Sequence, residues 1–139
     1  LILPVGSEPN YVVAADFDED GRMDLATSNA GDDSLTVLFG RVGGFVPKVL
    51  PVGDAPTGLL VSDFDGDGHS DLLTASLSST EFRVVRGDGR GGFASAQVFP
   101  GTYEATSVAF GDLDGDGRQE LIVASSGTRR VSVYRNLTR

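Results

Sequence analysis

The chain has 139 residues, about the length of one domain, and carries 20 acidic against 11 basic residues for a formal net charge of −9. It has no cysteine, which excludes a disulfide framework and thiolate metal sites, and it has no basic stripe of the kind that binds nucleic acid. No apolar run approaches the ~18 residues that a membrane-spanning helix needs.

The first predicted elements are short apolar strands. Residues 1–5 are apolar and contain a proline, which predicts an edge strand because proline has no N–H for a neighbour; the pattern returns at 49–53 and 98–101. Residues 11–15, 58–62 and 107–111 are nearly continuously apolar, which predicts strands buried on both faces.

Each of these apolar strands runs into an acidic loop, and a second and a third strand follow. The second strands are expected at 25–28, 72–76 and 121–125, and polar turns at 31–33, 78–80 and 127–129. The third strands, at 35–39, 82–85 and 131–134, alternate in polarity and are expected to be half-exposed. Gly-Gly-Phe turns at 43–45 and 91–93 then lead to the proline-containing edge strands, and no helix is expected.

The acidic loop is the clearest motif of the sequence. In residues 63–72 the carboxylates stand at positions 1, 3, 5 and 9, and position 6 is a glycine, which can adopt positive φ. The motif recurs at 16–25 and 112–121, and the three loops hold 13 of the 20 acidic residues. Because most of the acidic residues lie in these loops, the negative net charge is interpreted as metal-ligand charge rather than as a surface for a cationic partner.

These loops are predicted to bind Ca²⁺, one ion per repeat and three per chain. Clustered carboxylates repel one another, and Ca²⁺ removes the repulsion because it accepts six to eight oxygen ligands. Position 7 would contribute its backbone carbonyl. The predicted ligand residues are Asp16, Asp18, Asp20, Arg22 and Asp24 in the first loop, Asp63, Asp65, Asp67, His69 and Asp71 in the second, and Asp112, Asp114, Asp116, Arg118 and Glu120 in the third.

An EF-hand sensor is the alternative for such loops. It needs flanking helices and a glutamate at position 12, where this chain has Thr27, Thr74 and Val123. A structural site between two strands is therefore expected, and weak sites of this kind fill at extracellular calcium levels, which favours a secreted or cell-surface location. The apolar residues at positions 2 and 10 are expected in the core; they are Phe17, Phe64 and Leu113, and Leu25, Leu72 and Leu121.

Four short antiparallel strands in about 48 residues, repeated three times, predict the blades of an all-β β-propeller. A β-sandwich would not explain why loop, Gly-Gly-Phe turn and edge strand recur in phase. The expected organisation is a single domain of three four-stranded blades, at about 7–53, 54–101 and 102–139.

The pattern Asp-x-Asp-x-Asp-Gly-x-x-(Asp/Glu)-Leu, followed by Phe-Gly and Gly-Phe, resembles the FG-GAP/VCBS repeat family. That family includes the calcium-bearing blades of integrin α-subunit propellers and of many secreted bacterial proteins. The resemblance implies that the loop acids are Ca²⁺ ligands, and that the chain is an interaction or adhesion module for a protein partner, without catalysis. Two departures are Glu120 at position 9 and a third repeat without the Gly-Gly-Phe turn and edge strand.

Two other functions are the alternatives to a protein-binding module. One is a lectin-like propeller that binds glycans, for which Tyr11 and Tyr103 stand at equivalent points before the first strands, although the second repeat has Thr57 and Gly58 there. The other is a set of accessory blades of a larger enzyme.

Three blades are too few for a ring, since propellers typically carry four to eight. One hypothesis is a homodimer in which residues 1–5 of each chain pair beside residues 131–134 of the other and close a six-bladed ring. The alternative is a fragment of a longer propeller, and the first residue, Leu1, suggests a processed or excised piece.

Four further features are expected to have no specific function. Glu19 is interpreted as a solvated charge, and the ring of His69, the only histidine, as solvent-facing. Arg86-Gly87-Asp88 matches a tripeptide that some integrins recognise, but a glycine-rich hairpin turn is the favoured interpretation. Residues 136–138 match a glycosylation pattern. With one histidine beside a metal loop, no Ser/His/Asp catalytic arrangement is predicted.

Overall fold

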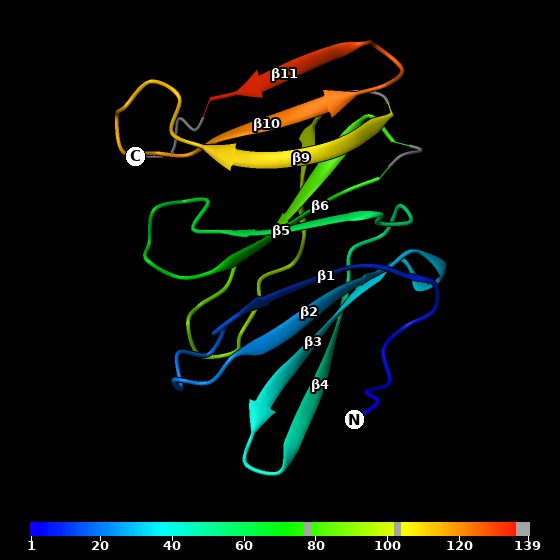
Figure 1. Cartoon of the computed structure of the whole chain (residues 1–139), viewed down its shortest axis with the longest axis vertical. Coiled ribbons are helices and arrows are strands. Elements are labelled where there is room, and N and C mark those ends of the chain that lie inside the picture. The colour runs from blue at the N-terminus through cyan, green and yellow to red at the C-terminus, as the bar shows by residue number, and fades with distance from the viewer. Residues whose placement is uncertain (77–78, 102–103, 136–139) are drawn as a thin grey trace.

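The computed structural model describes residues 1–76, 79–101 and 104–135, and it is an all-β structure of three antiparallel sheets (Figure 1). The first sheet contains β1 (Pro9–Ala15), β2 (Asp24–Asn29), β3 (Ser34–Arg41) and β4 (Gly44–Pro51). The second contains β5 (Gly58–Ser62), β6 (Asp71–Ala75), β7 (Glu81–Val85) and β8 (Gln97–Pro100), and the third β9 (Ala105–Gly111), β10 (Glu120–Ser125) and β11 (Arg130–Tyr134).

Within each sheet the strands follow one another in chain order, as the repeat predicts. The 3₁₀ turn η1 (Ala30–Asp32), between β2 and β3, is the one helical segment among the described residues. No helix in the described part of the chain is long and apolar enough to cross a membrane.

The three sheets are stacked in chain order, with β1–β4 at one end and β9–β11 at the other (Figure 1). The first strands of successive sheets lie side by side, since β1 contacts β5 and β5 contacts β9. The sheets of one chain do not close on themselves, because the first and third sheets are at opposite ends of the stack (Figure 1).

We call the face of each sheet that carries the last leucine of its loop (Leu25, Leu72 or Leu121) the front face, and the opposite face the back face. The back face of the first sheet packs on the front face of the second, and Val37, Leu59 and Leu72 belong to the buried cluster between them. The back face of the second sheet packs on the front face of the third in the same way. The fully buried side chains of that second core include Leu73, Val84, Leu121 and Val123. Each such residue contributes about 1.5–3 kcal/mol by burial, so these two cores hold the stack together.

Burial differs from the sequence-based expectation in the first and third strands. The strand β1, predicted to be buried on both faces, is mostly exposed, because among the described residues another sheet packs on only one face of its sheet. The strand β3, predicted to be half-exposed, is buried along its length except at Arg41. Its polar residues are accommodated by Asn29, whose side-chain amide donates to Ser34 Oγ (3.2 Å) and Thr36 Oγ1 (2.9 Å).

The expectation of a core position is wrong for Leu113. Its equivalent Phe17 is 1% exposed between the first two sheets and meets the edge of Phe93, with ring centroids 5.9 Å apart. Phe64 packs similarly on Phe99 and Phe110 of the next interface. Leu113 is 59% exposed, because none of the described strands covers the back face of the third sheet.

The N-terminal segment also differs from the prediction. Residues 1–6 form no strand. Pro4 and Val5 instead line a groove on the first sheet together with Thr36 and Val49. The third sheet has three strands among the described residues, so its edge strand β11 has no neighbour on its outer side.

Candidate metal centres

The three acidic loops adopt one conformation, which the first aspartate of each loop organises. In the second loop, Asp63 Oδ1 accepts hydrogen bonds from the N–H groups of Gly66 (2.8 Å) and Asp67 (3.1 Å), and Oδ2 accepts one from Gly68 (2.9 Å). Asp16 and Asp112 accept equivalent bonds at positions 4 to 6 of their loops. The carboxylate at position 1 therefore folds the loop around itself.

Two positions of each loop require positive φ. The glycine at position 6 has φ of 87°, 90° and 86° in the three loops, as predicted. Position 4 also has positive φ, at 80° for Gly66 and 78° for Gly115, and Glu19 adopts the same conformation at 55°. Sequence reasoning missed this second requirement, although glycine at position 4 in two of the three loops was the available signal.

The acid at position 9 is buried and joins the loop to the end of the third strand. Asp24 accepts the N–H groups of Phe17 (2.8 Å) and Gly40 (2.7 Å), and Asp71 accepts those of Phe64 (2.9 Å) and Gly87 (2.9 Å). Burial raises the pKa of Asp71, and these two backbone hydrogen bonds oppose the rise. Glu120, with its longer side chain, still accepts the N–H of Leu113 at 2.8 Å.

Positions 1, 3 and 9 come together in each loop. Their carboxylate oxygens lie within 4.8 Å of one another in three clusters, composed of Asp16, Asp18 and Asp24; Asp63, Asp65 and Asp71; and Asp112, Asp114 and Glu120. The position-5 residues Asp20, Asp67 and Asp116 are outside these clusters and accept the N–H of position 7 instead. Coordination by Asp20, Asp67 and Asp116, and by the carbonyls of Arg22, His69 and Arg118, stays a prediction.

The position-3 carboxylates show that the clusters suit a cation. Asp18 Oδ1 and Asp65 Oδ1 are buried and accept no hydrogen bond, and the Asp18 side chain is only 9% exposed. A buried acceptor without a partner is costly, and a carboxylate oxygen can be satisfied by a donor or a metal ion. The donor set is composed of hard oxygens, which is the chemistry that Ca²⁺ prefers.

Two arginines that the sequence analysis did not identify lie at these same carboxylates. Arg41 pairs with Asp18 and also with Asp20 at 3.1 Å, and its pKa is raised by the hydrogen bond to Asp18. Arg86 Nε lies 3.0 Å from Asp65 Oδ2. Among the described residues, no comparable ion pair involves the acids of the third loop.

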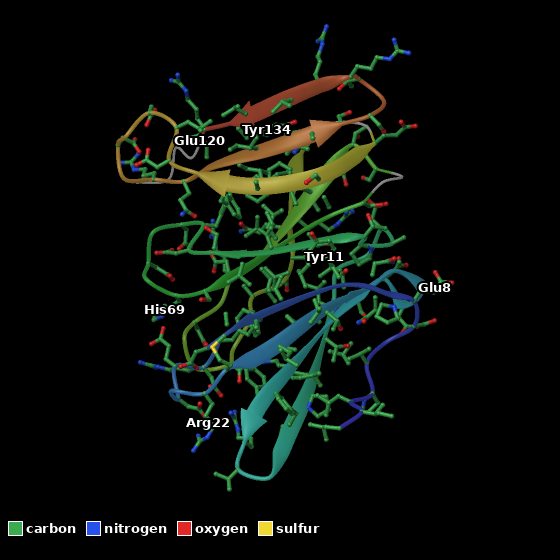
Figure 2. All side chains as sticks on the ribbon, viewed as in Figure 1. Glu8, Tyr11, Arg22, His69, Glu120 and Tyr134 are labelled. Carbon is green, nitrogen blue, oxygen red and sulfur yellow. The ribbon has the colours of Figure 1, made fainter. Side chains whose placement is uncertain are left out.

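The first two loops are also joined to each other. His69 Nδ1 lies 2.6 Å from Glu19 Oε1, and this hydrogen bond raises the pKa of His69 above its ordinary value of 6.5. Both side chains were expected to face solvent, and Glu19 is 51% and His69 34% exposed. Their contact with each other, which joins the loops of adjacent sheets, was not predicted. Figure 2 shows His69 and Arg22 on the same side of the stack, at the left of the view.

The Arg86-Gly87-Asp88 tripeptide is a turn in which all three residues have internal roles. Gly87 is buried and donates to Asp71, and Arg86 pairs with Asp65. Asp88 accepts the N–H groups of Arg90 and Gly92, both at 2.8 Å. This confirms the interpretation as a hairpin turn. The glycosylation-like pattern at 136–138 lies outside the described residues, as does Tyr103.

The chain is a repeat protein of three stacked antiparallel sheets. Each sheet has, between its first and second strands, an acidic loop whose carboxylates could hold a metal ion. A family model described as FG-GAP-like repeat matches residues 16–74 and again 63–123. The chain belongs to this FG-GAP-like repeat family, as its motifs indicate. No curated protein matches the chain.

Proposed function

We propose that the chain is a calcium-stabilised, extracellular β-propeller module that binds a protein partner and has no catalytic activity of its own. The observation that carries the proposal is the repeated acidic cluster with an unpartnered buried oxygen, Asp18 Oδ1 or Asp65 Oδ1, in two of the three loops. Membership of the FG-GAP-like repeat family supports the propeller and interaction parts of the proposal.

In this proposal, positions 1, 3 and 9 hold the ion and the protein supplies a preformed site. The bound ion would neutralise the clustered carboxylates. Asp71 connects the loop to Gly87 at the end of β7, and Asp24 connects its loop to Gly40 in β3. Calcium binding is therefore expected to stabilise the first three strands of each sheet relative to one another.

Titration calorimetry tests this role. Wild-type protein, freed of metal by chelation, is expected to bind Ca²⁺ at three sites per chain, and Asp65→Asn is expected to lose one. The control is Glu8→Gln, which removes an exposed acid outside the loops and is expected to leave three sites. No heat of binding with the wild type would contradict the proposal.

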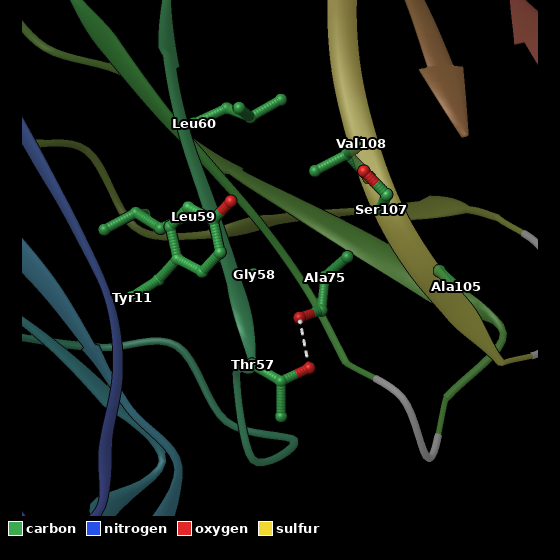
Figure 3. A pocket seen from close by; sticks show the side chains of 9 residues that line it. All are labelled: Tyr11, Thr57, Gly58, Leu59, Leu60, Ala75, Ala105, Ser107 and Val108. Atoms are coloured by element: carbon green, nitrogen blue, oxygen red, sulfur yellow. Dashed lines mark hydrogen bonds between the residues drawn. The ribbon is translucent and has the colours of Figure 1, made fainter. Parts of the chain in front are cut away.

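Glycan binding is the second candidate function, and the pocket in Figure 3 is the observation that favours it. This cavity of about 100 Å³ lies between the first strands, and the ring of Tyr11 stands beside it with the hydroxyl groups of Thr57 and Ser107. An aromatic face with neighbouring hydroxyl groups suits a sugar. Binding on a glycan array that Tyr11→Ala abolishes would favour this function over a protein partner, and an array without binding would exclude it for the glycans tested.

A further inference from the structure

The turn between β7 and β8, residues 86–93, lies between the metal centres of the first two sheets. Hydrogen bonds across the turn fix its shape. Asp88 donates its N–H to the carbonyl of Gly92 (3.2 Å), and its carboxylate accepts the N–H of Gly92 (2.8 Å). At the base of the turn, Ala94 donates to the carbonyl of Arg86 (2.9 Å). Because these bonds hold the turn as one unit, ordering of one end also orders the other.

One end of the turn is joined to the second loop. Gly87 donates its N–H to the position-9 acid Asp71 (2.9 Å). Two residues further on, a Cβ at Gly89 would lie 2.6 Å from Glu19 Oε1 and closer still to the ring of His69. The backbone of the turn therefore packs directly on the hydrogen bond that joins the second loop to the first.

The other end of the turn packs on the first loop. A Cβ at Gly91 would lie 3.4 Å from the Cβ of Asp18. The ring of Phe93 meets that of Phe17, at position 2 of the same loop. Lys48 of β4 holds this end on the first sheet, since its ammonium group donates to the carbonyl of Gly91 (2.8 Å) and lies over the Phe93 ring. A turn of the second sheet thus covers part of the first metal centre.

This cover bears on the strength of the first site. The Asp18 side chain is 9% exposed, against 21% for its equivalent Asp65. Its Oδ1 is buried and has no hydrogen-bond partner among the described residues. Charges interact more strongly where water is excluded, so a cation at Asp18 is bound more tightly when the turn is in place.

Glu19 is held in a backbone conformation that suits glycine. It stands at position 4 of the first loop, where the other loops have Gly66 and Gly115, and its φ is 55°. This left-handed conformation is disfavoured for residues with a Cβ. Here it accompanies the 2.6 Å hydrogen bond to His69 of the second loop. A strained residue kept in place by its surroundings indicates a role, and this contact places Glu19 in the link between the loops.

We propose that the first two metal centres bind calcium as one coupled unit, with the turn 86–93 and Glu19 as the link between them. An ion at the second loop fixes Asp71 and with it the turn that covers Asp18. The first loop then binds its ion at a smaller cost in conformational entropy. Because such coupling is reciprocal, an ion at the first loop also tightens binding at the second. This coupling rests on the calcium binding proposed above.

Titration calorimetry of variants with chosen loops measures the coupling. Asp114→Asn disables the third loop and leaves the first two. Adding Asp65→Asn or Asp18→Asn to it leaves the first or the second loop alone. For independent sites, the two single-loop association constants multiply to the overall constant of the two-loop protein. Coupling predicts that the measured overall constant exceeds this product by at least fivefold.

Two double variants of the two-loop protein, each compared with its own single-loop forms, test the link. Glu19→Gly with Lys48→Met gives the first loop the glycine of the other loops and removes the hydrogen bonds to His69 and to Gly91. It is expected to lower the coupling below twofold while both loops still bind calcium. The matched control, Glu19→Gln with Lys48→Arg, keeps side chains that can form both hydrogen bonds and is expected to keep the coupling.

The contact between the loops is also tested without metal. In chelator, unfolding by urea of Glu19→Gly, His69→Ala and the variant with both changes forms a double-mutant cycle, and the two effects are expected to be non-additive. Three outcomes would each overturn the proposal and leave calcium binding intact: additive effects, a coupling below twofold in the two-loop protein, or a coupling that changes equally in the two double variants. No heat of binding in the wild type would instead overturn the proposed calcium sites, and the coupling with them.

Discussion

At the residue scale, the carboxylate at position 9 and the glycine it binds form one unit. Gly87 donates its N–H to Asp71, and a Cβ at Gly87 would lie 2.3 Å from the carbonyl oxygen of Ser70. Gly40 approaches the carbonyl of Met23 in the same way, at 2.6 Å. The glycine is thus required because the loop and the end of the third strand lie in contact.

Replacing Gly87 with alanine is expected to destabilise the protein by about 2–4 kcal/mol, since either the backbone shifts or the hydrogen bond to Asp71 is lost. The free energy of unfolding by urea measures the effect. Gly44→Ala is the control: a Cβ there meets no atom within 4 Å and φ is not positive, so its stability should change little. Equal stability of the two variants would contradict the close approach.

Arg86 is expected to weaken calcium binding at the second loop, because its positive charge lies 3.0 Å from Asp65 Oδ2. Arg86→Gln should tighten Ca²⁺ binding at one site by roughly fivefold, the effect of about 1 kcal/mol between partly solvated charges. Titration calorimetry measures it, with Arg90→Gln as a control on the same turn. Weaker binding by Arg86→Gln would show instead that Arg86 supports the site.

At the element scale, the strands around each loop were predictable from the sequence, whereas a strand at residues 1–5 was not found and burial was predicted only in part. The run of apolar residues before each loop and the alternation after it gave the strands within a few residues, because these patterns are local. Whether a strand is covered depends on the neighbouring sheets: β1 is mostly exposed where the equivalent β5, with a sheet on either side, is half-buried, and Leu113 is exposed where Phe17 is buried. The arginine pairs and the His69–Glu19 contact were missed because they join residues distant in sequence.

Asp54, in the connection between β4 and β5, pairs with Arg83 of β7, and this ion pair predicts a pH dependence. Hydrogen bonds from Ser79, and also from Arg83 at 2.8 Å, lower the pKa of Asp54 below its ordinary value of 3.8. Because the pKa of Asp54 is lower in the folded than in the unfolded chain, its ionised carboxylate stabilises the folded state above the unfolded-state pKa. This contribution is lost as the pH falls through the folded-state pKa.

Asp54→Asn is therefore expected to lower the free energy of unfolding by about 1 kcal/mol at pH 7. On acidification from pH 7 to about 3, the free energy of unfolding of the variant should fall by less than that of the wild type. Asparagine tolerates the positive φ of 62° at this position, so backbone strain does not complicate the comparison. Unfolding free energies are compared in a chelator, which removes any contribution from calcium. Parallel pH profiles would contradict the role of Asp54.

At the scale of the whole molecule, the sheets are held together by two apolar cores, and the loops lie at the margins of those cores. Phe17 and Phe64 extend from their loops into the cores, and the position-9 acids tie the same loops to the third strands. Stability of the stack and the state of the loops are thus linked. An ion that binds only the folded loops stabilises the folded chain by mass action.

The melting temperature with and without calcium tests this account most directly. Each occupied site contributes about 2.7 kcal/mol at a hundredfold excess of Ca²⁺ over Kd, so saturation of three sites should raise the melting temperature by roughly 10 °C or more over the chelated protein. Magnesium at the same concentration should raise it less, because Mg²⁺ keeps its water ligands and demands octahedral geometry. An identical melting temperature in excess calcium and in chelator would contradict the account.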